Sequence, residues 1–270
     1  MKVLSKSRFK IGLSCPNKLF FSGNKSYKNK EDDNTFLASL AEGGFQVEAL
    51  ARLSYPGGHF IDAPYGAYEK AYNQTLELLK QDEVVVYEAA FLYDGLFVMT
   101  DILVKKGNQV RLIEVKAKSF DSTQANNFIG SRGDIRSGWR PYLFDIAFQS
   151  YVAKKCVPHL HFDTFFLMAD KSKVATIDGL NQMFRLPVDG DIRKDVEVKI
   201  SAAEAQKTSV LSEVNVTEIV DLIIKDNYRY SDNLYFSRAV TLLRDSYQNQ
   251  SIQTGQQIIA DVNPVSLKLV

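Results

Sequence analysis

Two apolar runs joined by a Gly-Asn turn constrain the fold of this chain more than any other feature. The first run begins at Asp101-Ile-Leu-Val, the second is Arg111-Leu-Ile-Glu-Val-Lys116, and Gly107-Asn108 lies between them. Runs rich in β-branched residues on either side of such a turn predict a β-hairpin. A third β-rich run, at 82–93, is followed by a second turn signal, Asp94-Gly95. We therefore expect successive β-strands across this segment.

Two carboxylates and a lysine of the hairpin can converge on one face of the sheet. Side chains alternate between the faces of a strand, so Glu114 and Lys116 share a face, and Asp101 can join them from the neighbouring strand. Mg²⁺ prefers oxygen ligands and keeps part of its water shell, so two carboxylates suit an ion that must also bind phosphate. Such an ion activates water for phosphodiester cleavage, and Lys116 would orient that water or stabilise developing charge.

The same spacing has a structural interpretation, because acidic and basic residues often pair across the strands of half-exposed hairpins. A predicted helix further along the chain favours the interpretation of these residues as a functional site. The run 141–155 has a proline in its first turn and ends in lysines, as helices often do. Gln149 is a polar residue embedded in the apolar sequence of this helix.

The order of these features resembles a known family. Along the chain come Glu88 in Tyr-Glu-Ala-Ala-Phe, Asp101, Glu114-Val-Lys116, and a helix carrying Ala-Phe-Gln149-Ser-Tyr151. This order is similar to that of the PD-(D/E)XK nuclease superfamily, and within it of the RecB-like exonuclease branch. The chain resembles in particular an uncharacterised bacterial family of RecB-like predicted nucleases, over roughly residues 3 to 170. The resemblance implies an α/β, restriction-endonuclease-like fold with a mixed central sheet flanked by helices.

The resemblance also implies roles for individual residues. Asp101 and Glu114 would be the principal ligands of Mg²⁺ or Mn²⁺, with the Val115 carbonyl as an additional ligand. Lys116 would be the catalytic lysine. Gln149 would orient the substrate or that lysine.

Two more glutamates are candidate metal ligands with structural alternatives. Glu48 matches the place where the branch carries a metal-ligating His or Glu on its first helix, but it could equally be a helix charge paired with Arg52 four residues later. Glu88 lies among apolar residues, where a carboxylate needs a partner or a metal. It is either a metal ligand or a paired glutamate at a strand edge.

The chain departs from the family pattern in three respects. The branch commonly carries Gln-x-x-x-Tyr, whereas Ala153 stands four residues after Gln149 and the tyrosine is Tyr151, which points in another direction on a helix. Cys15 and Cys156 are too few for the four-cysteine iron-sulfur cluster of some relatives, so we expect no such cluster. Long relatives carry a further C-terminal region, which implies either that such a region is missing here or that a protein partner supplies its role.

DNA binding would have to rely on localised positive charge. The net charge of +1 excludes the uniformly basic surface of a structural DNA-binding protein. Basic residues interleaved with Gly and one Trp after the second hairpin strand could supply phosphate contacts and a stacking platform. With Tyr151, these candidates are Lys118, Arg132, Arg136, Trp139 and Arg140. The alternative is a solvated loop whose Trp packs into the core.

The remaining patterns predict elements that support the fold. We expect a helix over 35–54 that is broken near Gly43-Gly44, a helix over 68–79, and a central strand over 164–168. Beyond residue 195, apolar spacing predicts two helices, around 219–223 and 236–243. The chain is thus divided into a nuclease core, 1–195, and a mostly helical C-terminal region, 196–270, that packs on it.

These patterns together predict a metal-dependent deoxyribonuclease, by family analogy an exonuclease acting on single-stranded ends in DNA repair or defence. The alternatives are a nucleic-acid-binding or assembly module that keeps the nuclease fold without turnover, and an endonuclease working as a dimer; the oligomeric state stays open. Two cysteines, the lack of an apolar signal core and the lack of a bilayer-length apolar run predict a soluble cytoplasmic protein without membrane contact.

Overall fold

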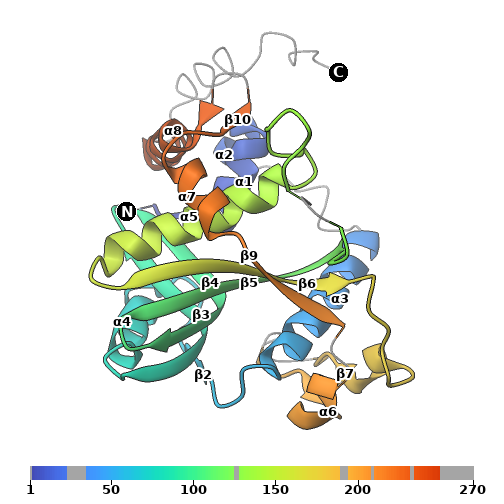
Figure 1. Ribbon diagram of the computed structural model, residues 1–270. Coiled ribbons are helices and arrows are strands. Elements are labelled where there is room, and N and C mark those ends of the chain that lie inside the picture. Colours follow the sequence, from blue (N-terminus) through green and yellow to red (C-terminus); the bar gives the residue numbers. More distant parts are fainter. Residues whose placement is uncertain are drawn as a thin grey trace.

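The predicted strands between residues 83 and 120 form the middle of a seven-stranded mixed sheet (Figure 1). The computed structural model describes residues 2–22, 35–124, 128–188, 194–207, 210–231 and 234–249. Strands β3 (Glu83–Tyr93), β4 (Leu96–Lys106) and β5 (Gln109–Phe120) pair antiparallel in succession. Asp94 and Gly95 join the first two strands with φ angles of 48° and 72°, the left-handed values that a type I′ hairpin turn requires.

The sheet has the order β2-β3-β4-β5-β6-β9, and β1 also pairs with β4. The outer members are β1 (Leu4–Ser5), β2 (His59–Phe60), β6 (His161–Asp170) and β9 (Leu211–Asn215). Strand β6 runs parallel to β5, so a crossover must link the two, and helix α5 (Arg140–Cys156) provides it.

Helices cover both faces of the sheet. Figure 1 shows α5 lying along one face, with α1, α2, α7 and α8 gathered beyond it and α3 at the other face. The helices are α1 (Lys6–Ser14), α2 (Pro16–Phe21), α3 (Thr35–Arg52), α4 (Tyr68–Leu78), α6 (Ala202–Lys207), α7 (Thr217–Ile224) and α8 (Phe236–Asn249). Short elements complete the described parts: the 3₁₀ helix η1 (Leu180–Met183), β7 (Phe184–Arg185), β8 (Glu197–Val198), β10 (Arg229–Ser231) and β11 (Leu234–Tyr235).

Strand alternation divides the apolar interior into two clusters. On the α5 side, Leu103 and Leu112 join a large cluster in which the rings of Phe9 and Phe148 stack with centroids 4.2 Å apart. On the α3 side, Ile102 and Ile113 join a smaller cluster that includes Ala49, Leu50 and Ala51. The sheet is therefore buried on both faces over its centre.

The predicted fold class is confirmed: the chain is α/β, with a mixed central sheet flanked by helices and with further helices toward the C-terminus. The predicted helices over 141–155, 219–223 and 236–243 and the strand over 164–168 all lie within observed elements, and the helix predicted over 68–79 is observed over Tyr68–Leu78. No helix in the described ranges is long and apolar enough to cross a bilayer.

The predicted break of the first long helix is wrong. Helix α3 continues through Gly43 and Gly44, because residues further along it are held by packing on the sheet, which outweighs the weak helix propensity of two glycines. The division of the chain at residue 195 stays a prediction. Strand β9 lies beyond that boundary and still pairs with β6 in the central sheet.

Two glycine substitutions should change stability in opposite directions. A Cβ at Gly44 meets no heavy atom within 4 Å, so Gly44→Ala should raise the free energy of unfolding by about 0.5–1 kcal/mol through helix propensity. A Cβ at Gly58 overlaps the ring of Tyr87, so Gly58→Ala should lower it by about 1–3 kcal/mol through overpacking. Urea denaturation measures both changes, and a destabilised Gly44→Ala would contradict the continuous helix.

Candidate active site

The candidate site lies where one edge of β4 changes partner. Strand β3 pairs with β4 along its length, so β1 and β5 must share the opposite edge. There β1 pairs with Leu96 and Phe97, and β5 pairs from Ile102 onward. Among the described residues, no strand pairs with positions 98–101 on this edge. Asp101 lies in this gap, and its Oδ2 accepts a hydrogen bond of 2.7 Å from the Val115 backbone N–H.

Glu114 is the centre of the polar cluster in the gap. Its side chain is 1% exposed. Its Oε1 accepts a hydrogen bond from Lys116, and its Oε2 accepts one of 2.9 Å from Gln149 Nε2. Glu114 is therefore in direct contact with Lys116 and with Gln149, two of the predicted catalytic residues.

An N-terminal lysine joins both carboxylates. Lys6 is the first residue of α1, and its Nζ lies 3.2 Å from each carboxylate oxygen of Glu114 and 3.6 Å from Asp101 Oδ1. Strand β1 ends at Ser5, beside Phe97, so the chain delivers Lys6 directly into the gap. One ammonium group thus bridges the two predicted metal ligands.

A buried aspartate on α5 completes the cluster. Asp145 is fully buried, and its Oδ2 lies 3.4 Å from Lys116 Nζ and 3.5 Å from Lys10 Nζ. It lies four residues before Gln149, so both side chains share one face of the helix. Asp145 Oδ1 and Gln149 Oε1 are buried and have no hydrogen-bond partner among the described residues. These two oxygens leave acceptor capacity within the site.

The charges of the cluster set its protonation. Burial alone would raise the pKa of Glu114, but Lys116 and Lys6 outweigh burial and hold the pKa well below its usual range. Burial would lower the pKa of both lysines, but the surrounding carboxylates raise it instead. Burial and the Glu114 charge raise the pKa of Asp101. Glu114 and both lysines are therefore charged at neutral pH, and Asp101 is the easier of the two carboxylates to protonate.

Glu88 lies in the same row of the sheet. The register pairs Tyr87 with Ile102 and Ala89 with Thr100, which places Glu88 opposite Asp101 on the next strand. Its φ of 57° is in the left-handed region, which costs a residue with a Cβ about 1–3 kcal/mol. Its charge contributes to the raised pKa of Lys6. Glu88 is therefore within electrostatic reach of the site, while metal ligation by it remains a prediction.

Glu48 forms an ion pair with Arg52, which is the role that the sequence offered as the alternative to metal binding. Its Oε2 lies 3.9 Å from Arg52 Nη1, one turn further along α3. Burial lowers the pKa of Arg52, and the charges of Glu48 and Glu88 partly offset that effect. Arg52 therefore interacts electrostatically with Glu48 and also with Glu88 and Asp101. A metal-binding role for Glu48 remains a prediction.

Two of the predicted nucleic-acid contacts are engaged in packing. The Trp139 ring makes edge contacts with Phe120 and Phe128, with centroids 6.5 and 5.1 Å away, and Lys118 Nζ lies 4.9 Å from its centroid. Arg140 donates hydrogen bonds to the backbone carbonyls of Tyr230 and Ile135. The contacts of Trp139 match the alternative in which this Trp packs into the core.

The other predicted contacts differ in exposure. Arg132 and Arg136 are exposed, and Arg136 Nε donates to the Ile129 carbonyl at 3.2 Å. Tyr151 packs edge-on against Phe236 of α8, with ring centroids 5.7 Å apart. Only the two arginines thus present a largely solvent-facing surface, and DNA contact by any of these residues remains a prediction.

Three residues of the cluster were absent from the sequence prediction. Lys6 and Lys10 lie one helical turn apart on α1, beside buried Phe9. Asp145 is a carboxylate within the apolar run Leu143-Phe144-Asp145-Ile146-Ala147. The sequence alone could have indicated a functional or paired role for Asp145, because a charged residue in an apolar run is buried and an unpaired buried charge is costly. The lysines carried no comparable signal, since basic residues near a chain start are common surface residues.

The donor set of Asp101 and Glu114 fits a divalent cation. Three of their oxygens already surround one ammonium at 3.2–3.6 Å, which shows that the carboxylates can converge on a single cation. The described residues contain no group of three or more acidic, His or Cys side chains placed to hold a metal. Two carboxylates are nevertheless sufficient for Mg²⁺, which usually keeps several waters and binds substrate phosphate. Mn²⁺ accepts the same oxygen ligands.

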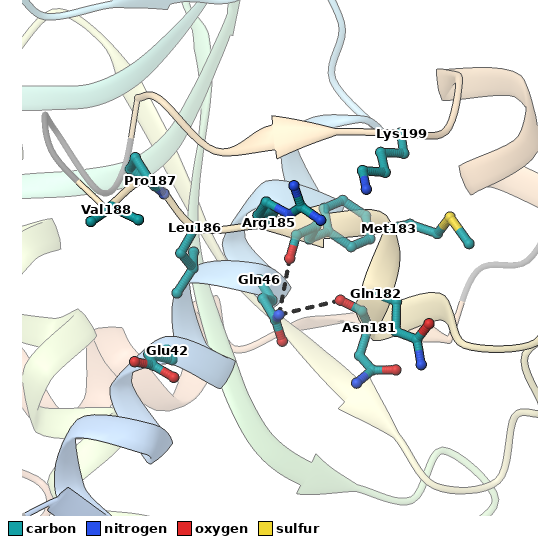
Figure 2. A pocket seen from close by; sticks show the side chains of 11 residues that line it. Glu42, Gln46, Asn181, Gln182, Met183, Arg185, Leu186, Pro187, Val188 and Lys199 are labelled. Atoms are coloured by element: carbon teal, nitrogen blue, oxygen red, sulfur yellow. Dashed lines mark hydrogen bonds between the residues drawn. The ribbon is translucent and has the colours of Figure 1, made fainter.

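A cavity that the described residues form is separate from this cluster. It has a volume of about 790 Å³ and lies between α3, η1 and β7 (Figure 2). Gln46 Nε2 reaches across it to the carbonyls of Asn181 and Phe184, at 3.2 and 3.0 Å. None of the residues that contact Asp101 or Glu114 lines it.

Comparison with known proteins adds little. No family model matches the chain, and no curated protein matches it. One similar solved structure is a protein from Eubacterium rectale described as a "Putative exonuclease", with 10% sequence identity and a TM-score of 0.37 over 96% of this chain and 83% of that chain. A TM-score this low does not establish a common fold.

Replacing Glu114 should remove a pH-dependent contribution to stability. Because the folded-state pKa of Glu114 is depressed, its contribution is present above the unfolded value of about 4.3 and is lost as the pH falls below it. Glu114→Gln should therefore lower the free energy of unfolding by about 3 kcal/mol at pH 7, and the difference from wild type should shrink below pH 4. Denaturation at several pH values measures it. Glu77→Gln, at a side chain that is 71% exposed, should change stability by under about 0.5 kcal/mol.

Proposed function

We propose that this protein is a metal-dependent nuclease of the RecB-like PD-(D/E)XK type, which hydrolyses DNA phosphodiester bonds with Mg²⁺ or Mn²⁺. The observation that carries the proposal is the convergence of Asp101, Glu114 and Lys116 in the gap beside β4, with Gln149 bound to Glu114. These residues come in the order and with the spacing of the family that the sequence resembles.

Each side chain of the cluster has a role in this reaction. Asp101 and Glu114 would hold the ion, with the Val115 carbonyl as an additional ligand. When bound, the ion supplies Lewis acidity that activates water and polarises the phosphoryl oxygen. Lys116 remains cationic because of its raised pKa, so it can stabilise negative charge on the phosphate or orient the attacking water.

Two residues of α5 position these groups. The Gln149 amide donates to Glu114 Oε2 and fixes the carboxylate plane. Asp145 lies 3.4 Å from Lys116 Nζ and holds the ammonium over the site. Neither residue needs to contact substrate to affect the reaction, because misplacing a catalytic group by about 1 Å is enough to slow it.

The finer assignments rest on family analogy. We propose single-stranded DNA ends as the preferred substrate, exonucleolytic cleavage as the mode, and DNA repair or defence as the setting. A protein partner would assist this activity.

One observation favours a second function. Lys6 and Lys116 already neutralise Glu114 without any metal, so the cluster is also compatible with a nucleic-acid-binding module that has no turnover. DNA binding with unchanged strand length across several metals would favour this alternative.

Substitutions within the cluster test the nuclease. Asp101→Asn and Lys116→Met should each reduce cleavage by about 100-fold or more, because each removes a group that stabilises the transition state. Degradation of end-labelled single- and double-stranded DNA is measured while Mg²⁺ and Mn²⁺ are titrated. Lys80→Met, at a side chain that is 71% exposed, is the control and should retain wild-type activity. Equal cleavage by wild type and both cluster variants would refute the assignment.

Lys6 should compete with the metal for the two carboxylates. Its ammonium contacts both of them, so Lys6→Met should bind Mn²⁺ about tenfold more tightly than wild type, as removal of one close positive charge at moderate screening predicts. Calorimetric titration with Mn²⁺ measures this without reference to activity. Lys10→Met is the control, since it removes one positive charge from the same helix. Because Lys10 pairs with Asp145 and not with the two carboxylates, a smaller gain in Mn²⁺ affinity is expected. A weaker affinity in Lys6→Met would show that Lys6 supports the metal instead.

A further inference from the structure

A second cavity, of about 520 Å³, adjoins the carboxylate pair. It lies between the first turns of α1 and α4, over the start of β4, and Lys6 forms part of its wall. The same lysine reaches Asp101 and Glu114 with its ammonium group. Phe97 and Met99 line the cavity and alternate with Asp101 along β4, so all three project from one face of the strand. The cavity and the proposed catalytic residues therefore lie on the same face of the sheet and share Lys6.

Aromatic side chains form the outer part of this cavity. Tyr65 is 96% exposed, which is unusual for a large ring that lines a cavity. Tyr68 packs against Phe97 with ring centroids 4.6 Å apart. Burial raises the pKa of Tyr247 on α8, and the nearby hydroxyls of Tyr68 and Tyr65 add to that shift. Tyr65 and Tyr68 therefore line the cavity, and Tyr247 lies beside it, in contact with Arg8.

The wall of the cavity also carries basic side chains. Lys6 and Arg8 line it, and no acidic side chain is among its lining residues in the described part of the chain. The Arg8 guanidinium lies 5.0 Å from the centroid of the Tyr247 ring, and Lys2 Nζ lies 5.5 Å from the same centroid. Neither cation has a carboxylate partner within the described part of the chain, so both are available to an anion.

We propose that this cavity binds one nucleotide of a single DNA strand, next to the phosphate that is cleaved; this inference rests on the proposed nuclease function. The base stacks on Tyr65 and Tyr68, and its phosphate lies toward Arg8 and Lys6. A groove that combines stacking rings with basic side chains is the usual way in which proteins hold single-stranded nucleic acid. The volume is within the range of small-molecule sites and can hold one nucleotide.

The proposal has a consequence for substrate choice. A base that stacks on tyrosine rings inside a cavity must first leave its own helical stack, and this is easiest for a single strand. The cavity therefore selects single-stranded ends over blunt duplex. Duplex DNA can contact the basic residues but cannot place a paired base between the tyrosines.

Binding without catalysis tests the cavity. Fluorescently labelled oligo(dT) and a blunt duplex of equal length are titrated in EDTA, so that no strand is cut. Tyr65→Ala should weaken oligo(dT) binding by about tenfold, since loss of one base–aromatic stack has that order of effect, and should leave duplex binding unchanged. Tyr65→Trp should restore the affinity. Tyr235→Ala, at another partly exposed tyrosine, is the matched control and should bind like wild type.

Arg8→Gln provides a second test, through charge. It should weaken binding of both oligo(dT) and thymidine monophosphate, and it should reduce the dependence of oligo(dT) affinity on salt. Unchanged oligo(dT) affinity in both Tyr65→Ala and Arg8→Gln would overturn the proposal.

The two proposals can fail separately. Metal-dependent cleavage, with unchanged oligo(dT) affinity in both Tyr65→Ala and Arg8→Gln, would refute the nucleotide cavity and leave the nuclease standing. Weakened oligo(dT) binding in Tyr65→Ala, with no cleavage under any metal, would support the cavity and refute the nuclease.

Discussion

The site depends on a change of partner along one edge of β4. Strands β1 and β5 share that edge but do not meet, so the ladder is interrupted over positions 98–101 in the described structure. An interrupted ladder leaves backbone groups to be satisfied by other means, and Asp101 does this by accepting from the Val115 N–H. The same gap leaves room for Lys6, the first residue of α1, whose ammonium group contacts Asp101 and Glu114.

Charge balance decides what this gap can do. Burying Asp101, Glu114 and Asp145 together is unfavourable unless cations accompany them, and Lys6 and Lys116 provide that compensation. In the proposed nuclease, a metal and a phosphate would take over part of this compensation when they bind. The lysine that neutralises a carboxylate in their absence would then be able to stabilise the phosphate.

The parts of the fold that were predicted from sequence share a local cause. The hairpin turns, the helix at 141–155 and the helix at 68–79 follow from turn chemistry and apolar periodicity, and all lie where expected. The break at Gly43-Gly44 was wrong because a local weakness of the helix was outweighed by packing further along it. The sequence could not decide whether Trp139 stacks on a nucleic-acid base or packs into the core. Its packing partners, Phe120 and Phe128, belong to other segments of the chain.

The sequence by itself determined that Glu114 and Lys116 share a face and that Asp101 can lie beside them, because alternation along a strand and the length of a hairpin are local rules. It equally placed Gln149 on an apolar helix. Only the tertiary structure decided that Lys6, 108 residues before Glu114 in the chain, bridges the two carboxylates, and that Asp145 supports Lys116. These contacts join helices α1 and α5 to strand β5. No spacing rule connects such residues, because their distance is set by how the helices pack on the sheet.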